Sequence, residues 1–66
     1  MERKNYRYTN NLGRKKEIWI TLNPNEQGEY PFSIWDLATG ELCSSGEASK
    51  EDLVSFLARY NVKADF

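Results

Sequence analysis

The residues best suited to a binding function in this chain are its two tryptophans, Trp19 and Trp35, together with Leu37. Tryptophan is enriched at the energetic centres of protein interfaces, and its flat ring is also a stacking platform for nucleic-acid bases. If the indoles face a core, they contribute to the packing of a small domain and form no binding surface. Indoles that face water form a candidate binding face, so the direction of these side chains decides the interpretation.

A second group with chemical potential is the basic run Arg14, Lys15 and Lys16, which we name as candidate phosphate contacts. Residues 1–16 hold six basic residues and one acid, whereas the rest of the chain holds three basic residues and nine acids. Such a basic head can attract nucleic acid, lie against its own acidic body, or keep the protein soluble. We favour the last two, because a nucleic-acid footprint needs a concentrated basic patch.

Composition excludes several kinds of catalytic and metal chemistry. The chain has no histidine, so neither a Ser-His-Asp nor a Cys-His arrangement can form within it. With Cys43 as the only cysteine, a structural zinc site cannot be assembled from the usual ligands, and no phosphate-binding glycine motif occurs. We therefore expect a protein that is not an enzyme, with no cofactor, no metal and no small-molecule substrate.

The length of the chain and its N-terminal residues limit the number of domains and the cellular locations to be considered. The 66 residues, 39% hydrophobic and 29% charged, fit one small folded domain over residues 1–66. A single cysteine cannot form an internal disulfide, and the start MERKNY has no apolar stretch behind its charges. We expect no secretory signal, no membrane-spanning helix and no membrane partner, and hence a cytoplasmic protein.

Two segments predict strands, because apolar residues recur at every second position from Lys16 to Leu22 and from Tyr30 to Trp35. Pro31 lacks an N–H group, so we place it at the start or the edge of a strand. A tight hairpin with loop residues 38–40 then leads to a third strand from Glu41 to about Ser45.

After Gly46 the spacing of apolar residues changes to that of a helix, with a stripe formed by Leu53, Phe56, Leu57 and Tyr60. Ser49 fits the N-cap and Asn61 fits the end, which predicts a helix over residues 49–61. Residues 1–15 form the basic head, which is either an edge strand that turns at residues 10–13 or a mobile arm. We favour the strand.

These elements predict an α+β fold in which residues 16–47 form a small antiparallel sheet with one C-terminal helix packed on one face. The sheet has three strands, or four if the head pairs with it.

The three-residue hairpin loop sets the predicted register, in which Leu37 lies opposite Glu41, Asp36 opposite Leu42, Trp35 opposite Cys43, and Ile34 opposite Ser44. One face is then aliphatic, with Leu42 on it and Asp36 at its rim. The other face carries Trp19, Trp35, Leu37 and Cys43.

A single helix covers one face of a small sheet, and the aliphatic face needs cover more, so we expect the tryptophans on the uncovered face. If Tyr6 and Tyr8 of the head, or Val62 and Phe66 of the tail, fold over that face, the tryptophans form a minor core. If they do not, the face is free to bind a partner.

The order of three strands and a C-terminal helix, ending in SIWDLATGELCSSGEASKEDLVSFL, is similar to the arm-DNA-binding domains at the front of some phage-type integrases. That resemblance of topology implies a basic sheet face that contacts DNA. The sheet predicted here is instead bordered by acids, namely Glu17, Glu29, Asp36, Glu41 and Glu47, and we claim no membership of that family.

We hypothesise a non-catalytic protein-binding module, such as an inhibitor, adaptor or accessory protein. It would use the Trp19/Trp35 face, or add a strand at an open sheet edge, and its partner would be another protein or a second copy. The alternative is a nucleic-acid-binding domain that uses the basic head together with the sheet aromatics.

Overall fold

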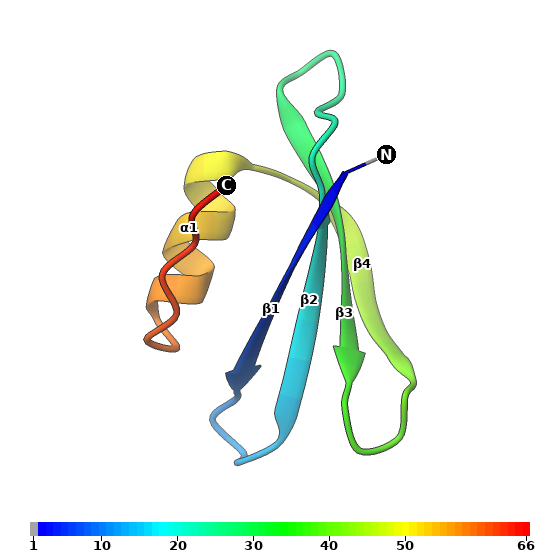
Figure 1. Cartoon of the computed structure of the whole chain (residues 1–66), viewed down its shortest axis with the longest axis vertical. Coiled ribbons are helices and arrows are strands. Elements are labelled where there is room, and N and C mark those ends of the chain that lie inside the picture. The colour runs from blue at the N-terminus through cyan, green and yellow to red at the C-terminus, as the bar shows by residue number, and fades with distance from the viewer. Residues whose placement is uncertain (1) are drawn as a thin grey trace.

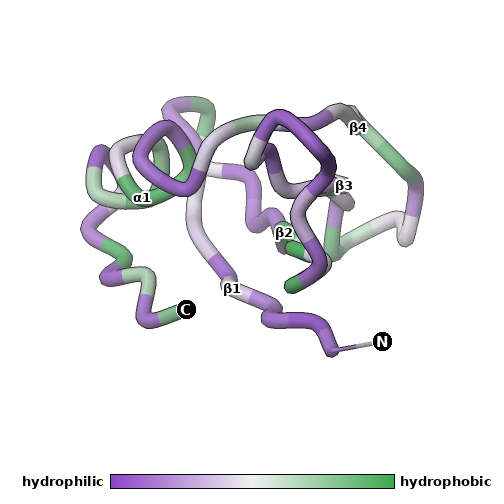
Figure 2. The backbone as a smooth tube through the Cα atoms, turned by 90° about the horizontal axis from the view of Figure 1, so that it is seen from above, coloured by the Kyte–Doolittle hydropathy of each residue, from purple (hydrophilic) through white to green (hydrophobic). Residues whose placement is uncertain are grey.

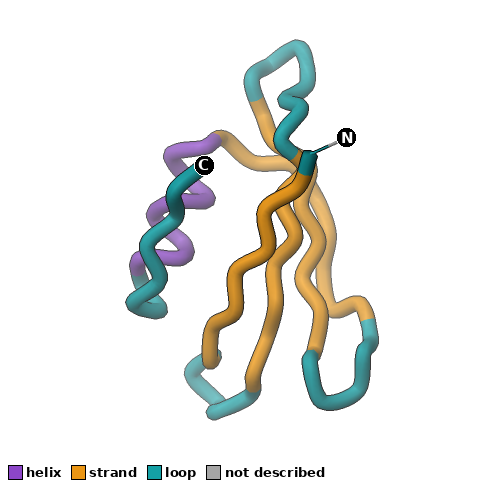
Figure 3. Tube along the Cα trace, viewed as in Figure 1, coloured by secondary structure: helices purple, strands orange, loops and turns teal. Residues whose placement is uncertain are grey.

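Four antiparallel strands and one helix make up the computed structural model, which describes residues 2–66 (Figures 1 and 3). The strands lie in the sheet in chain order. The elements are β1 (Arg3–Thr9), β2 (Lys15–Thr21), β3 (Glu29–Asp36), β4 (Leu42–Ser49) and α1 (Lys50–Ala58). The predicted α+β fold is confirmed, and the basic head supplies a fourth strand, which pairs along its whole length with β2.

The first two of the three hairpins are built in the same way from an asparagine side chain and a glycine. In the first, the Asn10 side-chain oxygen accepts the N–H groups of Leu12 and Arg14, and Gly13 has a φ of 77°. Asn25 and Gly28 repeat this arrangement between β2 and β3. In both cases the side chain replaces backbone partners while the glycine adopts the left-handed conformation that closes the turn.

Pro31 lies inside β3, which has a neighbouring strand on each side, and not at a strand start or sheet edge as predicted. The β3–β4 pairing passes through Pro31, whereas the β2–β3 pairing ends at the neighbouring pair of Ile20 and Phe32. Because proline has no N–H to donate, it is tolerated where the ladder on its donor side stops.

Helix α1 begins and ends as the sequence predicts, although its regular part is shorter than residues 49–61. The Ser49 hydroxyl accepts the N–H of Asp52, which caps the first turn. At the other end Asn61 has a φ of 62°, and the N–H of Val62 donates to the carbonyl of Leu57. These features form a Schellman ending, which directs the tail back along the helix.

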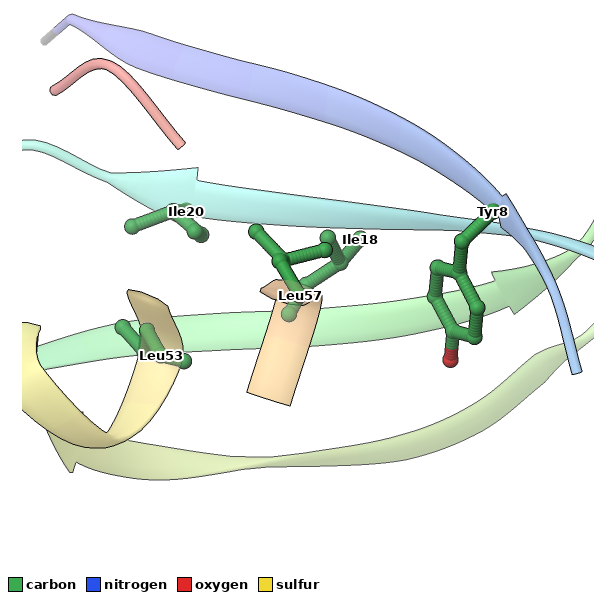
Figure 4. Close-up of a cluster of buried hydrophobic side chains, with 5 residues drawn as sticks. All are labelled: Tyr8, Ile18, Ile20, Leu53 and Leu57. Atoms are coloured by element: carbon green, nitrogen blue, oxygen red, sulfur yellow. The ribbon is translucent and has the colours of Figure 1, made fainter. Parts of the chain in front are cut away.

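The core lies between α1 and one face of the sheet. Leu53 and Leu57 point from the helix toward Ile18 and Ile20 of β2, and Tyr8 of β1 closes one end (Figure 4). The C-terminal tail packs on the same side of the sheet as α1 (Figure 1), where half-buried residues such as Phe66 join the core. The predicted position of the helix on the aliphatic face is therefore correct.

The β3–β4 register differs from the predicted one near the hairpin. The Asp36 side chain accepts the N–H groups of Ala38 and Thr39, and the Asp36 N–H donates to the Glu41 carbonyl, so the loop takes in Leu37 as well. Trp35 consequently pairs with Leu42, and not with Cys43.

A β-bulge at Cys43 then restores the predicted pairing of Ile34 with Ser44. The bulge also exchanges two side chains between the faces. Leu42 joins Trp35 on the uncovered face, and Cys43 moves to the helix side, where the Lys16 ammonium lies 3.3 Å from its sulfur. The strand itself continues to Ser49, beyond the predicted end near Ser45.

The small core makes each buried leucine important for stability. Replacing Leu57, which is fully buried, with alanine should lower the free energy of unfolding by about 2–5 kcal/mol through lost burial and a residual cavity. The same change at Leu12, which is 85% exposed in the first turn, should change it by less than about 0.5 kcal/mol. Denaturant titrations of both variants measure the difference, and equal costs would show that the helix does not cover this face.

Candidate protein-binding face

The sheet face turned away from α1, which we call the outer face, collects side chains from all four strands. The side chains that the register places on this face are Arg3, Asn5, Arg7, Thr9, Lys15, Glu17, Trp19, Thr21, Glu29, Pro31, Ser33, Trp35, Leu42, Ser45, Glu47 and Ser49. Seen from above, α1 and the tail lie on the other side of the curved sheet (Figure 2). The outer face therefore receives no cover from the helix.

The two indoles lie against each other at the centre of the outer face. Their ring centroids are 4.6 Å apart with an interplanar angle of 37°, and both residues are half-buried. Each indole N–H is bonded within its own strand, from Trp19 to Glu17 at 3.1 Å and from Trp35 to Ser33 at 2.9 Å. Because the polar atoms already have partners, the surface that this pair offers is the apolar part of the rings.

The aromatic residues that could have covered the tryptophans are elsewhere. Tyr8 lies in the core with Phe56 and Tyr60, and the Tyr6 hydroxyl donates to the Asp65 carboxylate at 2.6 Å on the helix side. Of the two alternatives left open by the sequence, the one in which the head tyrosines or the tail form a minor core with the tryptophans is therefore wrong. In its place the Arg3 guanidinium lies 4.0 Å from the centroid of the Trp19 ring, a cation–π contact.

Exposed leucines extend the apolar surface around the indoles. Leu37, which is 36% exposed in the β3–β4 hairpin, lines a shallow hollow together with both tryptophans, and Leu42 is 52% exposed on the neighbouring strand. Together with Trp19 and Trp35 they form what we call the aromatic patch. Sequence reasoning found three of its members and missed Leu42, because the bulge that turns it outward has no sequence signal of its own.

The candidate phosphate contacts do not form one patch. Arg14 and Lys16 both donate to the same oxygen of Asp36 at 3.0 Å, and the Lys16 side chain is only 13% exposed. Lys15 lies on the outer face, so it points away from Lys16. Two further members of the head are also paired within the chain: Arg7 with Glu17 at 3.2 Å, and Lys4 with Asp65 at 3.6 Å.

Asp36 is the buried polar residue at the end of the core, with 4% of its surface exposed. Hydrogen bonds from Lys16 and then from Arg14 hold the pKa of this carboxyl well below its usual range, and its bonds to the turn N–H groups act in the same direction. The same ion pairs raise the pKa of both basic side chains. The charged forms of all three groups are therefore favoured in the folded protein.

Comparison of the chain with protein-family models, with curated proteins and with solved structures finds no match. Over residues 2–66, no cluster of three or more acidic, cysteine or histidine side chains is arranged to hold a metal ion. In the same part of the chain, no helix has both the length and the apolar character needed to cross a membrane. The candidate site therefore stands on its geometry alone.

The pH dependence of stability tests the role of Asp36. Because folding lowers its pKa, the stabilisation is present above the unfolded-state value of about 3.9 and is lost as the pH falls below it. Asp36→Asn keeps the shape and an acceptor for the turn but removes the charge, so the variant should melt at a lower temperature at pH 7. The difference from wild type should shrink in acid.

Thermal melts between neutral pH and acid measure this difference. Glu26→Gln, in the exposed β2–β3 loop, serves as the matched control and should follow the wild-type profile. A gap between Asp36→Asn and wild type that stays constant across the pH range would contradict the role of the ion pair.

Proposed function

We propose that this chain is a non-catalytic protein-binding module and that the aromatic patch is its binding surface. One observation carries the proposal: two packed indoles and the exposed Leu42 share the sheet face away from the only helix of the described chain, and the exposed Leu37 lies beside them in the hairpin. Contiguous apolar surface of this kind on a small protein marks an interaction site more often than an idle surface.

The surroundings of the patch also resemble those of a protein interface. Tryptophan and arginine are the residues most often found at interface hot spots, and Arg3 lies directly over Trp19. Polar side chains, among them Ser33, Ser45 and Glu47, lie around the apolar centre. An apolar centre with a polar rim is the usual anatomy of such a surface.

The edges of the sheet are less suitable for a partner. A strand that adds to β4 would meet the bulge at Cys43 and the charge of Glu47, and both features discourage edge pairing. Nucleic acid is also less well supported, since four of the six basic side chains of residues 1–16 already contact carboxylates within the chain. Binding that depended on phosphate neutralisation would have to break those pairs.

Affinity capture with the tagged protein tests the proposal. Wild type should retain a protein partner from a lysate of the host cells, and Trp35→Ser should retain at least about tenfold less, because truncating a hot-spot residue costs about 2 kcal/mol or more. Leu12→Ser is the matched control, since Leu12 is more exposed than any patch residue but lies in the β1–β2 turn.

Circular dichroism of each variant establishes that the bait is folded, and detection includes an untagged copy of the chain itself among the captured proteins. Equal retention by wild type and folded Trp35→Ser would refute the patch as the binding surface. Loss of retention by Leu12→Ser would do the same.

A further inference from the structure

The outer face carries a charge pattern that is complementary to itself, and we infer that its partner is a second copy of this chain. The two copies pack face to face about a two-fold axis that runs parallel to the strands. This inference rests on the proposed function, since it names the partner of the same aromatic patch. The argument uses the register of the sheet, the positions of the unpaired charges and the area of the face.

The register places opposite charges at the two ends of one row of the outer face. Arg3 on the edge strand β1 lies opposite Thr21, and Glu47 on the other edge strand β4 lies opposite Pro31. The β2–β3 pairing ends at Ile20 and Phe32, and Thr21 and Pro31 are the residues that follow this pair on the two strands. The row therefore begins with a cation on one edge and ends with an anion on the other.

Both end charges are available to a partner. Among residues 2–66 neither Arg3 nor Glu47 takes part in an ion pair: Arg3 lies over Trp19, and Glu47 accepts a hydrogen bond from the Asn25 amide at 3.0 Å. Arg7, the other cation that β1 presents on this face, is already paired with Glu17. The edge strands therefore present two unpaired charges on this face, the cation Arg3 on β1 and the anion Glu47 on β4.

Symmetry then decides how two such faces fit. A two-fold axis parallel to the strands, between β2 and β3, lays β1 of one copy over β4 of the other and keeps each row in place. Arg3 of each copy then faces Glu47 of the other copy, so the contact forms twice. An axis across the strands would lay β1 over β1 and bring the Arg3 and Arg7 cations of the two copies together, which is unfavourable.

The same axis places Trp19 over a small side chain, and in the next row it places Trp35 over Glu17 of the other copy. Trp19 shares a row with Ser33 and Ser45, so the rotation places Trp19 of one copy over Ser33 of the other. The indole pairs of both copies meet near the axis and leave water together, as in the packed faces of a β-sandwich. Leu42, at the β4 end of the next row, falls under the aliphatic stem of Arg7 from the other copy.

The area of the face limits the strength of this dimer. Four strands about 4.8 Å apart and seven residues that rise about 3.3 Å each give a face of roughly 19 by 23 Å. Two such faces hide roughly 900 Å² in total, just below the size of about 1,000 Å² expected of a stable interface. The dimer should therefore dissociate in the micromolar range and exchange rapidly.

Sedimentation equilibrium from about 1 μM to about 1 mM measures the association of the wild-type chain, which should pass from monomer to dimer over this range. Arg3→Glu places acid against acid at both symmetric contacts, and Glu47→Arg places cation against cation. Each single variant should weaken its own homodimer at least tenfold. Circular dichroism confirms that both variants are folded.

Mixing the two single variants is the decisive experiment, because it tests whether Arg3 of one copy faces Glu47 of the other. In a heterodimer of Arg3→Glu with Glu47→Arg, both contacts again join opposite charges, so the mixture should associate about as tightly as wild type. Native mass spectrometry separates the species because the variants differ in mass, and it should show heterodimer in excess over both homodimers. The double variant should also recover association, since it restores both contacts with the signs exchanged.

Three results would overturn the inference: a wild-type chain that is monomeric over the whole range, single variants that dimerise like wild type, or a mixture without preference for heterodimer. The wild-type chain could stay monomeric and still capture a different protein in a way that requires Trp35. That result would leave the proposed function standing and remove only the second copy as partner. Absence of both self-association and capture would remove both.

Discussion

A helix of nine residues can cover only one face of a four-stranded sheet, and the rest of this protein follows from which face it covers. Helix α1 buries Leu53 and Leu57 against the isoleucines of β2, and the tail packs beside it. That leaves the outer face, with both tryptophans, outside the core. Over residues 2–66 the structure has no further helix or strand on that side of the sheet, so apolar side chains stay at the surface there.

The buried carboxylate of Asp36 links the end of this core to two of the hairpins. Its one oxygen accepts the N–H groups of Ala38 and Thr39, and the other receives Arg14 and Lys16 from the β1–β2 side. This arrangement lengthens the β3–β4 loop and thereby turns Leu42 outward. The carboxylate also pairs with two basic side chains, Arg14 and Lys16, so one interaction shapes the aromatic patch and weakens the case for phosphate binding at the same time.

Patterns of neighbouring residues in the sequence predicted most of this architecture. The alternation of apolar and polar residues around Trp19 and Trp35 predicted two strands and which side chains share a face. Ser49, as an N-cap residue, predicted where the helix begins. The bulge at Cys43 was not predictable, because it depends on how the Asp36 side chain bonds to the turn, which no spacing rule encodes. The polar β1 segment was ambiguous for a similar reason: its pairing depends on contacts between distant parts of the chain, such as Tyr6 with Asp65.

The central claim, that the chain itself leaves the tryptophans open to water, is tested most directly by quenching of their fluorescence. Both tryptophans of the protein lie on the outer face, so the whole indole signal reports on it. In solution dilute enough for monomer alone, the account predicts emission shifted toward that of indole in water, as expected for half-exposed rings, and quenching of both residues by acrylamide. Blue-shifted emission that resists the quencher at that dilution would show that the chain buries this face itself, and would contradict the account.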